Sequence, residues 1–157
     1  MSLPADPVHR MRAPRPARLD HVYLEVGSLG RARRFYDRIL PRLGFRRLPA
    51  GYPAWVGYRG GGMTLWLTES RPARVVRQPP HVPTDGKDDP ISDHLGFRVG
   101  SGARVRQLEG ALRRAGLRPV YGFDRLPQGS SWYISCAFRD PDENVLEIYA
   151  VTPRRRR

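Results

Sequence analysis

Apolar residues alternate with polar or aromatic ones along residues 20–26. A period of two is typical of a β-strand that is buried on one face. The period then changes, because apolar residues recur at helical spacing over residues 32–43. This spacing predicts an amphipathic helix, with Ser28 as its N-cap and Gly44 at its end. In the strand, the predicted core face consists of Val22, Leu24 and Val26, and the opposite face of His21, Tyr23 and Glu25.

The same pattern occurs a second time. Residues 93–101 repeat residues 20–28 at an offset of 73, and the two copies share Asp-His at the start and Val-Gly-Ser at the end. In the second copy Ser101 is the predicted cap and Gly116 the predicted stop of the helix. Short strand-like runs follow each helix, at about 44–48, 54–58 and 63–69 and at about 117–122, 132–138 and 144–151. An internal repeat of this kind predicts an α+β fold made of two tandem βαβββ modules.

The domain boundaries follow from the repeat and from composition. A stretch rich in proline and charged residues separates the two copies, and arginine-rich segments lie at both ends. Such segments are typical of linkers and tails. The predicted division is 1–18 as a disordered tail, 19–69 as the first module, 70–92 as the linker, 93–151 as the second module and 152–157 as a basic tail.

The net charge of +13 first suggests a nucleic-acid partner. However, the first 18 residues carry four arginines and one aspartate, and Arg154–Arg157 add four more, which leaves +6 for the rest of the chain. The remaining arginines are scattered and form no stripe interleaved with aromatic residues, so nucleic-acid binding is not expected. No apolar stretch is long enough for a membrane span. A single cysteine, Cys136, excludes an intramolecular disulfide and favours a reducing cytoplasmic location.

Strand alternation places His21 and His94 at equivalent positions of the two modules, on the face opposite the predicted core. In the last strand Leu146 and Ile148 belong to the core, so Glu147 points to that same open face. Imidazole nitrogen and carboxylate oxygen suit a divalent ion such as Fe, Mn, Zn, Ni or Co. We therefore expect these two histidines and the glutamate to hold one metal ion, with coordination positions left open for substrate.

At this point the chain resembles the vicinal oxygen chelate superfamily, which includes glyoxalase I, extradiol dioxygenases, fosfomycin-resistance thiol transferases and bleomycin-resistance proteins. The resemblance covers about residues 19–151. It rests on Leu19-Asp20-His21-Val22, on Phe35-Tyr36-Asp37 with Leu43-Gly44-Phe45, on Asp93-His94-Leu95-Gly96-Phe97 and on residues 140–147. The last follows the pattern Asp-Pro-Asp-Gly-Asn-x-x-Glu, except that Glu143 replaces the glycine. The resemblance implies two curved mixed sheets that form a metal-binding funnel, with a small organic substrate bound through adjacent oxygens.

Departures from the members' patterns leave the subtype open. Glyoxalase I carries a fourth ligand on the fourth strand, where this chain has Trp66, while Glu69 lies three residues on and should face the other way. Extradiol dioxygenases carry a His and a Tyr before the Asp-Pro turn, but here no His is present and Ala137 stands where that Tyr is expected. Fosfomycin-resistance proteins have Thr at the position of Tyr23. Lyase, dioxygenase and thiol-transferase activities therefore remain candidates.

Further residues are expected to line the funnel. We predict Glu25 and Tyr133 as groups that move a proton, and Arg98 as a contact for an anionic substrate. The other predicted substrate contacts are Tyr23, Trp66 and Tyr149. The resemblance also implies a homodimer. The alternative function is a protein that sequesters a drug or metabolite, as bleomycin-resistance proteins do.

Overall fold

The computed structural model describes residues 18–49, 54–69 and 94–154. The N-terminal half contains four strands, one α-helix and one short 3₁₀ helix. Their bounds are β1 His21–Val26, α1 Leu29–Ile39, η1 Leu40–Leu43, β2 Arg46–Arg47, β3 Trp55–Gly60 and β4 Met63–Glu69. The C-terminal half repeats this order with longer strands. Its elements are β5 His94–Arg98, α2 Gly102–Arg114, β6 Pro119–Gln128, β7 Ser131–Arg139 and β8 Val145–Pro153.

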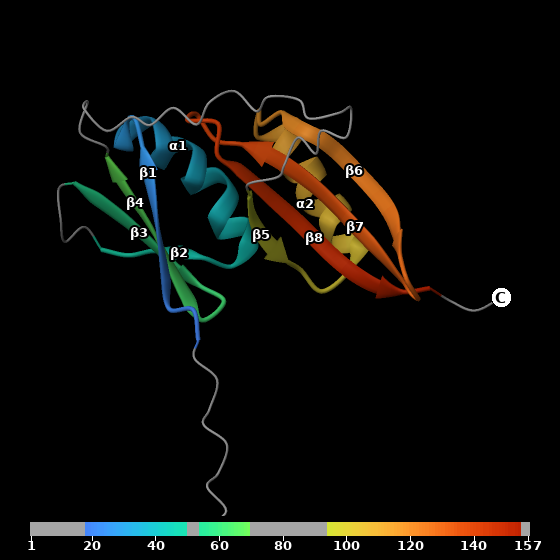
Figure 1. Ribbon diagram of the computed structural model, residues 1–157. Coiled ribbons are helices and arrows are strands. Elements are labelled where there is room, and N and C mark those ends of the chain that lie inside the picture. Colours follow the sequence, from blue (N-terminus) through green and yellow to red (C-terminus); the bar gives the residue numbers. More distant parts are fainter. Residues whose placement is uncertain (1–17, 50–53, 70–93, 155–157) are drawn as a thin grey trace, which may run out of the picture.

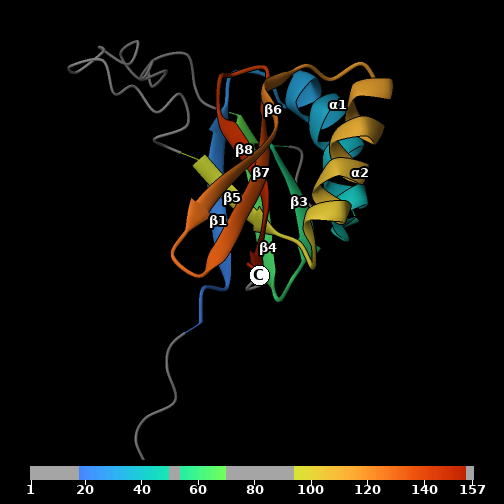
Figure 2. The same cartoon turned by 90° about the vertical axis from the view of Figure 1, so that its right-hand side faces the viewer.

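Each half forms its own four-stranded mixed sheet. Sheet A has the order β1-β4-β3-β2 and sheet B the order β5-β8-β7-β6. In both, the first strand lies at the edge and pairs in parallel with the last, while the other pairs are antiparallel. Figures 1 and 2 show the two sheets side by side with both helices close together. The predicted α+β fold with two βαβββ modules is confirmed.

The helices begin where the sequence predicts. The Ser28 hydroxyl accepts a hydrogen bond from the backbone N–H of Arg31, and the Ser101 hydroxyl accepts one from Arg104. In the first module the helix is shorter than predicted, because it changes to a 3₁₀ turn at Leu40. Pro41 in that turn lacks the N–H that an α-helix would need.

The strand faces also follow the predicted alternation. In β1 the side chains of Val22, Leu24 and Val26 are buried or half-buried, and the residues between them are exposed. In β5 the same alternation leaves His94 exposed and Leu95 half-buried. The open face of each sheet, defined as the face turned away from its own helix, therefore carries the residues that were singled out for chemistry.

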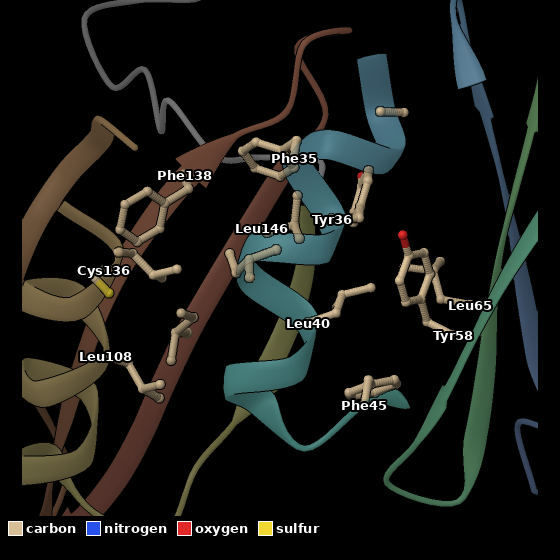
Figure 3. Packing of buried hydrophobic residues seen from close by; sticks show 14 of the residues in the cluster. Phe35, Tyr36, Leu40, Phe45, Tyr58, Leu65, Leu108, Cys136, Phe138 and Leu146 are labelled. Carbon is tan, nitrogen blue, oxygen red and sulfur yellow. The ribbon is translucent and has the colours of Figure 1, made fainter. Parts of the chain in front are cut away.

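One hydrophobic core joins the two modules. Figure 3 shows α1 between the sheets, with Phe35 near Leu146 and Phe138 of sheet B, and Tyr36 near Tyr58 of sheet A. All five side chains belong to a single buried cluster, and Phe45 packs edge-to-face on Phe97 across the modules. The two halves are thus repeats in sequence but share one interior.

The turn between β7 and β8 is organised by a buried carboxylate. Asp140 accepts hydrogen bonds from the backbone N–H groups of Asp142 and Asn144, from the Asn144 amide and, at 2.9 Å, from the Tyr36 hydroxyl of α1. Glu143, which replaces the glycine of the resembled pattern, has φ 70°. This left-handed conformation normally costs a residue with a side chain about 1–2 kcal/mol. The backbone at Glu143 is therefore strained.

The predicted linker 70–92 and the predicted tail 1–18 lie almost wholly outside the described residues, as does the end of the basic tail. Their structure is not tested. The last strand continues to Pro153, two residues beyond the predicted strand. No helix in the described part of the chain is long and apolar enough to cross a membrane.

Candidate metal centre

A buried glutamate lies at the centre of the open face of sheet B. Glu147 is 1% exposed, although it is an acidic residue and points away from the main core. Its Oε1 accepts a hydrogen bond from the Tyr121 hydroxyl at 2.9 Å, and its Oε2 one from the Tyr133 hydroxyl at 2.5 Å. A carboxylate that leaves water needs such partners, because an unpaired buried charge is costly. The two tyrosines, one on β6 and one on β7, satisfy it.

The surroundings of Glu147 follow from one row of residues across the sheet. Tyr121 of β6 lies opposite Ala137 of β7, Ala137 lies opposite Glu147 of β8, and Glu147 lies opposite Gly96 of β5. Both residues next to Glu147 in this row are small. Ala137 allows the Tyr121 side chain to reach over it, and Gly96 allows the Tyr149 ring to lie on the other side, where an added Cβ would be 3.2 Å from Tyr149 Cε1 and 3.9 Å from Glu147 Oε2.

His94 completes this half of the site. Its Nε2 lies 3.3 Å from Glu147 Oε2, and its side chain is 29% exposed. Two ligands of one transition-metal ion lie roughly 3 to 3.5 Å apart when bond lengths are about 2.0–2.2 Å. The separation and the chemistry of the two donors therefore fit a metal ion.

Burial raises the pKa of both tyrosines above the ordinary value, and the Glu147 carboxylate raises it further. For Tyr121 the hydrogen bond with Ser135 acts in the opposite direction. Both hydroxyls therefore stay protonated and act as donors to Glu147. Tyr149 stacks on the Tyr133 ring, with centroids 5.1 Å apart, and so holds that side chain over the sheet.

The other predicted residues lie on the open face of sheet A. The His21 side chain is half-exposed, its Nδ1 lies 3.0 Å from Asp20 Oδ2, and its ring packs edge-on to Tyr23. Tyr23 stacks on Trp66, its register partner on β4, at 6.3 Å. Trp55 of β3 packs against both rings. These four side chains form an aromatic cluster in which Tyr23 is 48% and Trp55 is 38% exposed.

Trp66 and Glu69, the two residues considered for a fourth metal-ligand position, lie on opposite faces of β4. Trp66 belongs to the open face, as its contact with Tyr23 shows. Glu69 instead accepts a hydrogen bond from the backbone N–H of Leu29 at 2.9 Å, at the first turn of α1. The carboxylate therefore serves the helix N-terminus, where negative charge is favourable.

The described residues of one chain bring His94, Glu147, Tyr133 and Tyr149 together, but they contain no group of three or more potential metal-ligating side chains. His21 is thus separate from the pair formed by His94 and Glu147. Glu25 and Arg98 are both exposed on the open faces of their strands. The three-ligand site stays a prediction.

A cavity of about 510 Å³ lies elsewhere, on the helix side of sheet B. It is lined by Ser101, Gly102, Ala103, Arg106, Phe123, Arg125, Ile134 and Thr152. None of the predicted site residues lines it, so it does not bear on the metal centre.

Sequence reasoning missed three residues of these surfaces, namely Tyr121, Ser135 and Trp55. Ser135 alternates in phase with Tyr133, so a stricter count along β7 would have found it. Trp55 lies on β3, a strand for which no face was predicted. Tyr121 is different. The register of β6 shifts on both sides of it, and a β-bulge changes the face to which a side chain points.

Comparison with known proteins agrees with this geometry. The model of the Glyoxalase/Bleomycin resistance protein/Dioxygenase superfamily matches residues 18–148. No protein with a curated description matches the sequence.

Several solved structures share the fold. A glyoxalase/bleomycin resistance protein/dioxygenase from Alicyclobacillus acidocaldarius is 19% identical, with a TM-score of 0.60 over 88% of this chain and 94% of that one. A protein of the same description from Nocardioides is 18% identical, with a TM-score of 0.61 over 93% of each chain. A glyoxalase/bleomycin resistance protein from Albidiferax ferrireducens is 20% identical, with a TM-score of 0.59 over 84% of this chain and 98% of that one. Since the family model spans both modules and the strand that carries Glu147, the chain belongs to the Glyoxalase/Bleomycin resistance protein/Dioxygenase superfamily.

Proposed function

We propose that the protein is a metal-dependent enzyme that acts on a small organic substrate bound through two adjacent oxygens. The observation that carries the proposal is the pair formed by His94 Nε2 and Glu147 Oε2, 3.3 Å apart on the open face of sheet B. The glutamate is buried, yet its neighbours in the row are only Ala137 and Gly96. A carboxyl group placed in so costly a position, within reach of a histidine nitrogen, favours a binding role over a structural one.

The third ligand in this proposal is His21. Its side chain is half-exposed on the edge strand of sheet A, and it forms no three-ligand group with the described residues of its own chain. A second copy of the chain offers a way to complete the site. Two-fold symmetry would then form two equal sites, each with His21 from one chain and with His94 and Glu147 from the other.

Each of the other groups has a role in this proposal. A bound divalent ion would act as a Lewis acid on the substrate oxygens. Tyr133 lies beside Glu147 Oε2 and holds a proton that can be donated to the substrate. Tyr23 and Trp66 offer ring faces to the apolar part of the substrate, Tyr149 keeps Tyr133 in place, and Arg98 attracts an anionic group. Glu25, exposed on the same face as His21, is the candidate base.

The first test is metal content. Elemental mass spectrometry of untagged protein, purified without chelator, should find about one equivalent of Fe, Mn, Zn, Ni or Co per chain. The double variant His21→Ala/Glu147→Ala should hold none, whereas His81→Ala, which leaves all three proposed ligands in place, should match the wild type. Absence of metal in the wild type, even after reconstitution, would contradict the enzyme proposal.

A mixing experiment tests the shared site. His21→Ala and Glu147→Ala are each expected to lose metal when purified alone. After the two are unfolded and refolded together, random pairing should restore about one quarter of the wild-type sites, because each mixed dimer contains one intact triad. If the triad formed within one chain, no site would be restored.

A drug- or metabolite-sequestering protein is the second candidate. The exposed aromatic cluster of Tyr23, Trp55 and Trp66 is the observation that favours it, since stacking on flat rings needs no metal. Such a protein would bind its ligand equally well in EDTA and after His94→Ala. The enzyme proposal expects both treatments to abolish turnover.

A further inference from the structure

We propose that Tyr121 is a positioning residue of the metal centre: its hydroxyl holds Oε1 of Glu147 and so turns Oε2, the oxygen beside His94, toward the metal. This inference rests on the proposed metal site. It adds a residue that the strand pattern did not reveal and gives each oxygen of the carboxylate a separate task.

The two oxygens of Glu147 have different surroundings. Oε1 accepts a hydrogen bond from the Tyr121 hydroxyl at 2.9 Å. Oε2 accepts a hydrogen bond from the Tyr133 hydroxyl at 2.5 Å and lies 3.3 Å from His94 Nε2, on the side of Gly96, where the Tyr149 ring also packs. The oxygen that lies beside a second metal-ligating atom is therefore Oε2.

Two features of sheet B bring the Tyr121 hydroxyl to this position. The register of β6 shifts on both sides of Tyr121, which allows its side chain to turn over the sheet. Its register partner is Ala137, which is fully buried and short enough for the phenol ring to pass above it toward Glu147. A larger residue at position 137 would occupy the path of the ring.

The Tyr121 hydroxyl is itself fixed by a second contact. It lies 3.1 Å from the Ser135 hydroxyl of β7, which is 4% exposed. The chain Ser135, Tyr121, Glu147 therefore leads from the middle of β7 to the ligand. Partners of this kind orient first-shell ligands, and their loss typically weakens metal binding by about 10- to 100-fold.

The test is a Co²⁺ titration of metal-free protein, because cobalt absorption in the visible range reports both affinity and ligand geometry. Tyr121→Phe removes one oxygen atom and should weaken Co²⁺ binding by about 10-fold or more and alter the spectrum. Ala137→Val should act in the same direction by displacing the ring. Tyr58→Phe is the matched control, because it removes a tyrosine hydroxyl that donates to a carboxylate, Asp37, outside the proposed site, and it should leave both affinity and spectrum unchanged.

Far-UV circular dichroism and the melting temperature of the metal-free variants separate folding from positioning. Ser135→Ala provides a milder second variant, with an expected loss of a few-fold. If wild type binds Co²⁺ and Tyr121→Phe binds it equally with the same spectrum, the role of Tyr121 is overturned while the metal site stands. If wild type does not bind Co²⁺, the proposed metal site fails, and the role of Tyr121 fails with it.

Discussion

Small residues determine where the large aromatic side chains of this protein lie. Gly57 faces Trp66 across β3 and β4, and a Cβ built at Gly57 would lie 2.5 Å from the indole ring. Trp66 therefore occupies the space of a missing side chain and is held against Tyr23. On sheet B the neighbours Ala137 and Gly96 do the same for the groups around Glu147. On both sheets, the positions of the aromatic side chains depend on a glycine or alanine at the neighbouring position.

The substitution Gly57→Ala tests whether Trp66 of sheet A needs the space that Gly57 leaves. The added methyl group must displace the Trp66 ring, so we expect a loss of about 1–3 kcal/mol in the free energy of unfolding, measured by urea denaturation. The indole fluorescence should change as well. Gly100→Ala is the control, because an added Cβ there meets nothing within 4 Å. Equal stability of the two variants would show that Trp66 does not need the space at Gly57.

The environment of a single buried residue also determines the reactivity of Cys136. It is fully buried in β7, and burial raises the pKa of its thiol to about 12. At pH 8 we expect no reaction with Ellman's reagent in the folded protein and one equivalent in urea. The unfolded chain releases this proton near pH 9, so stability should fall as the pH rises from about 9 to 12. Fast labelling of the native protein would contradict this.

At the scale of elements, the turn between β7 and β8 delivers Glu147 to its strand and docks α1 at the same time. Asp140 supports the turn through two backbone N–H groups and binds α1 through the Tyr36 hydroxyl. Its side chain is almost fully buried. The Asp-Pro-Asp segment therefore has a structural task beside the metal ligand that follows it.

Two substitutions separate the tasks of this turn. Tyr36→Phe removes one hydrogen bond to a charged group and should cost about 1.5–3 kcal/mol. Asp140→Ala removes the partner of several buried donors and should cost more. Chemical denaturation monitored by circular dichroism measures both. A larger loss for Tyr36→Phe than for Asp140→Ala would mean that the carboxylate is not the centre of the turn.

At Glu143, in the same turn, a substitution is expected to stabilise the protein. At φ 70° a glycine avoids the steric penalty of a side chain, so Glu143→Gly should stabilise the protein by about 0.5–1 kcal/mol. The lost ion pair with Arg139 lies at the surface and contributes little. Glu143→Asn, which tolerates this conformation better than glutamate, should give a smaller gain. A lower melting temperature for Glu143→Gly would contradict the strain.

The whole molecule has two repeats and one core. The largest buried cluster includes Tyr58 and Leu65 of sheet A together with Phe138 and Leu146 of sheet B. Backbone carbonyls also join the modules, since the Arg104 guanidinium donates to the carbonyl of Arg42 at 3.0 Å. Neither repeat can bury its apolar surface without the other.

We therefore expect one cooperative unfolding transition. Leu146→Ala leaves a cavity in the second module and should cost about 2–5 kcal/mol. Because the core is shared, it should shift the loss of Trp fluorescence and the loss of circular dichroism together. Protein concentration must be held constant, since the proposed dimer would melt in a concentration-dependent way. Two separate transitions would show that the modules unfold independently.

The periodicities of this chain are local properties, and local patterns determined most of the fold. Alternation along β1 and β5 gave the correct faces, and the recurrence of Asp-His and Val-Gly-Ser gave the two modules. Serine marked the start of both helices, and Gly116 marked the end of the second. Pro41 was visible as well, although its effect on the end of α1 was not anticipated. These features need only the spacing of side chains along one strand or one helix.

Only the tertiary structure determined which side chains from different strands come into contact. Alternation predicts the face of His21, His94 and Glu147 but not the distance between sheets, and only the last two come together within one chain. Tyr121 reaches Glu147 because β6 shifts register beside the short side chain of Ala137, which depends on pairing between three strands. Sequence by itself determined which residues face the site, whereas packing decided which of them touch, because contact depends on the placement of whole elements.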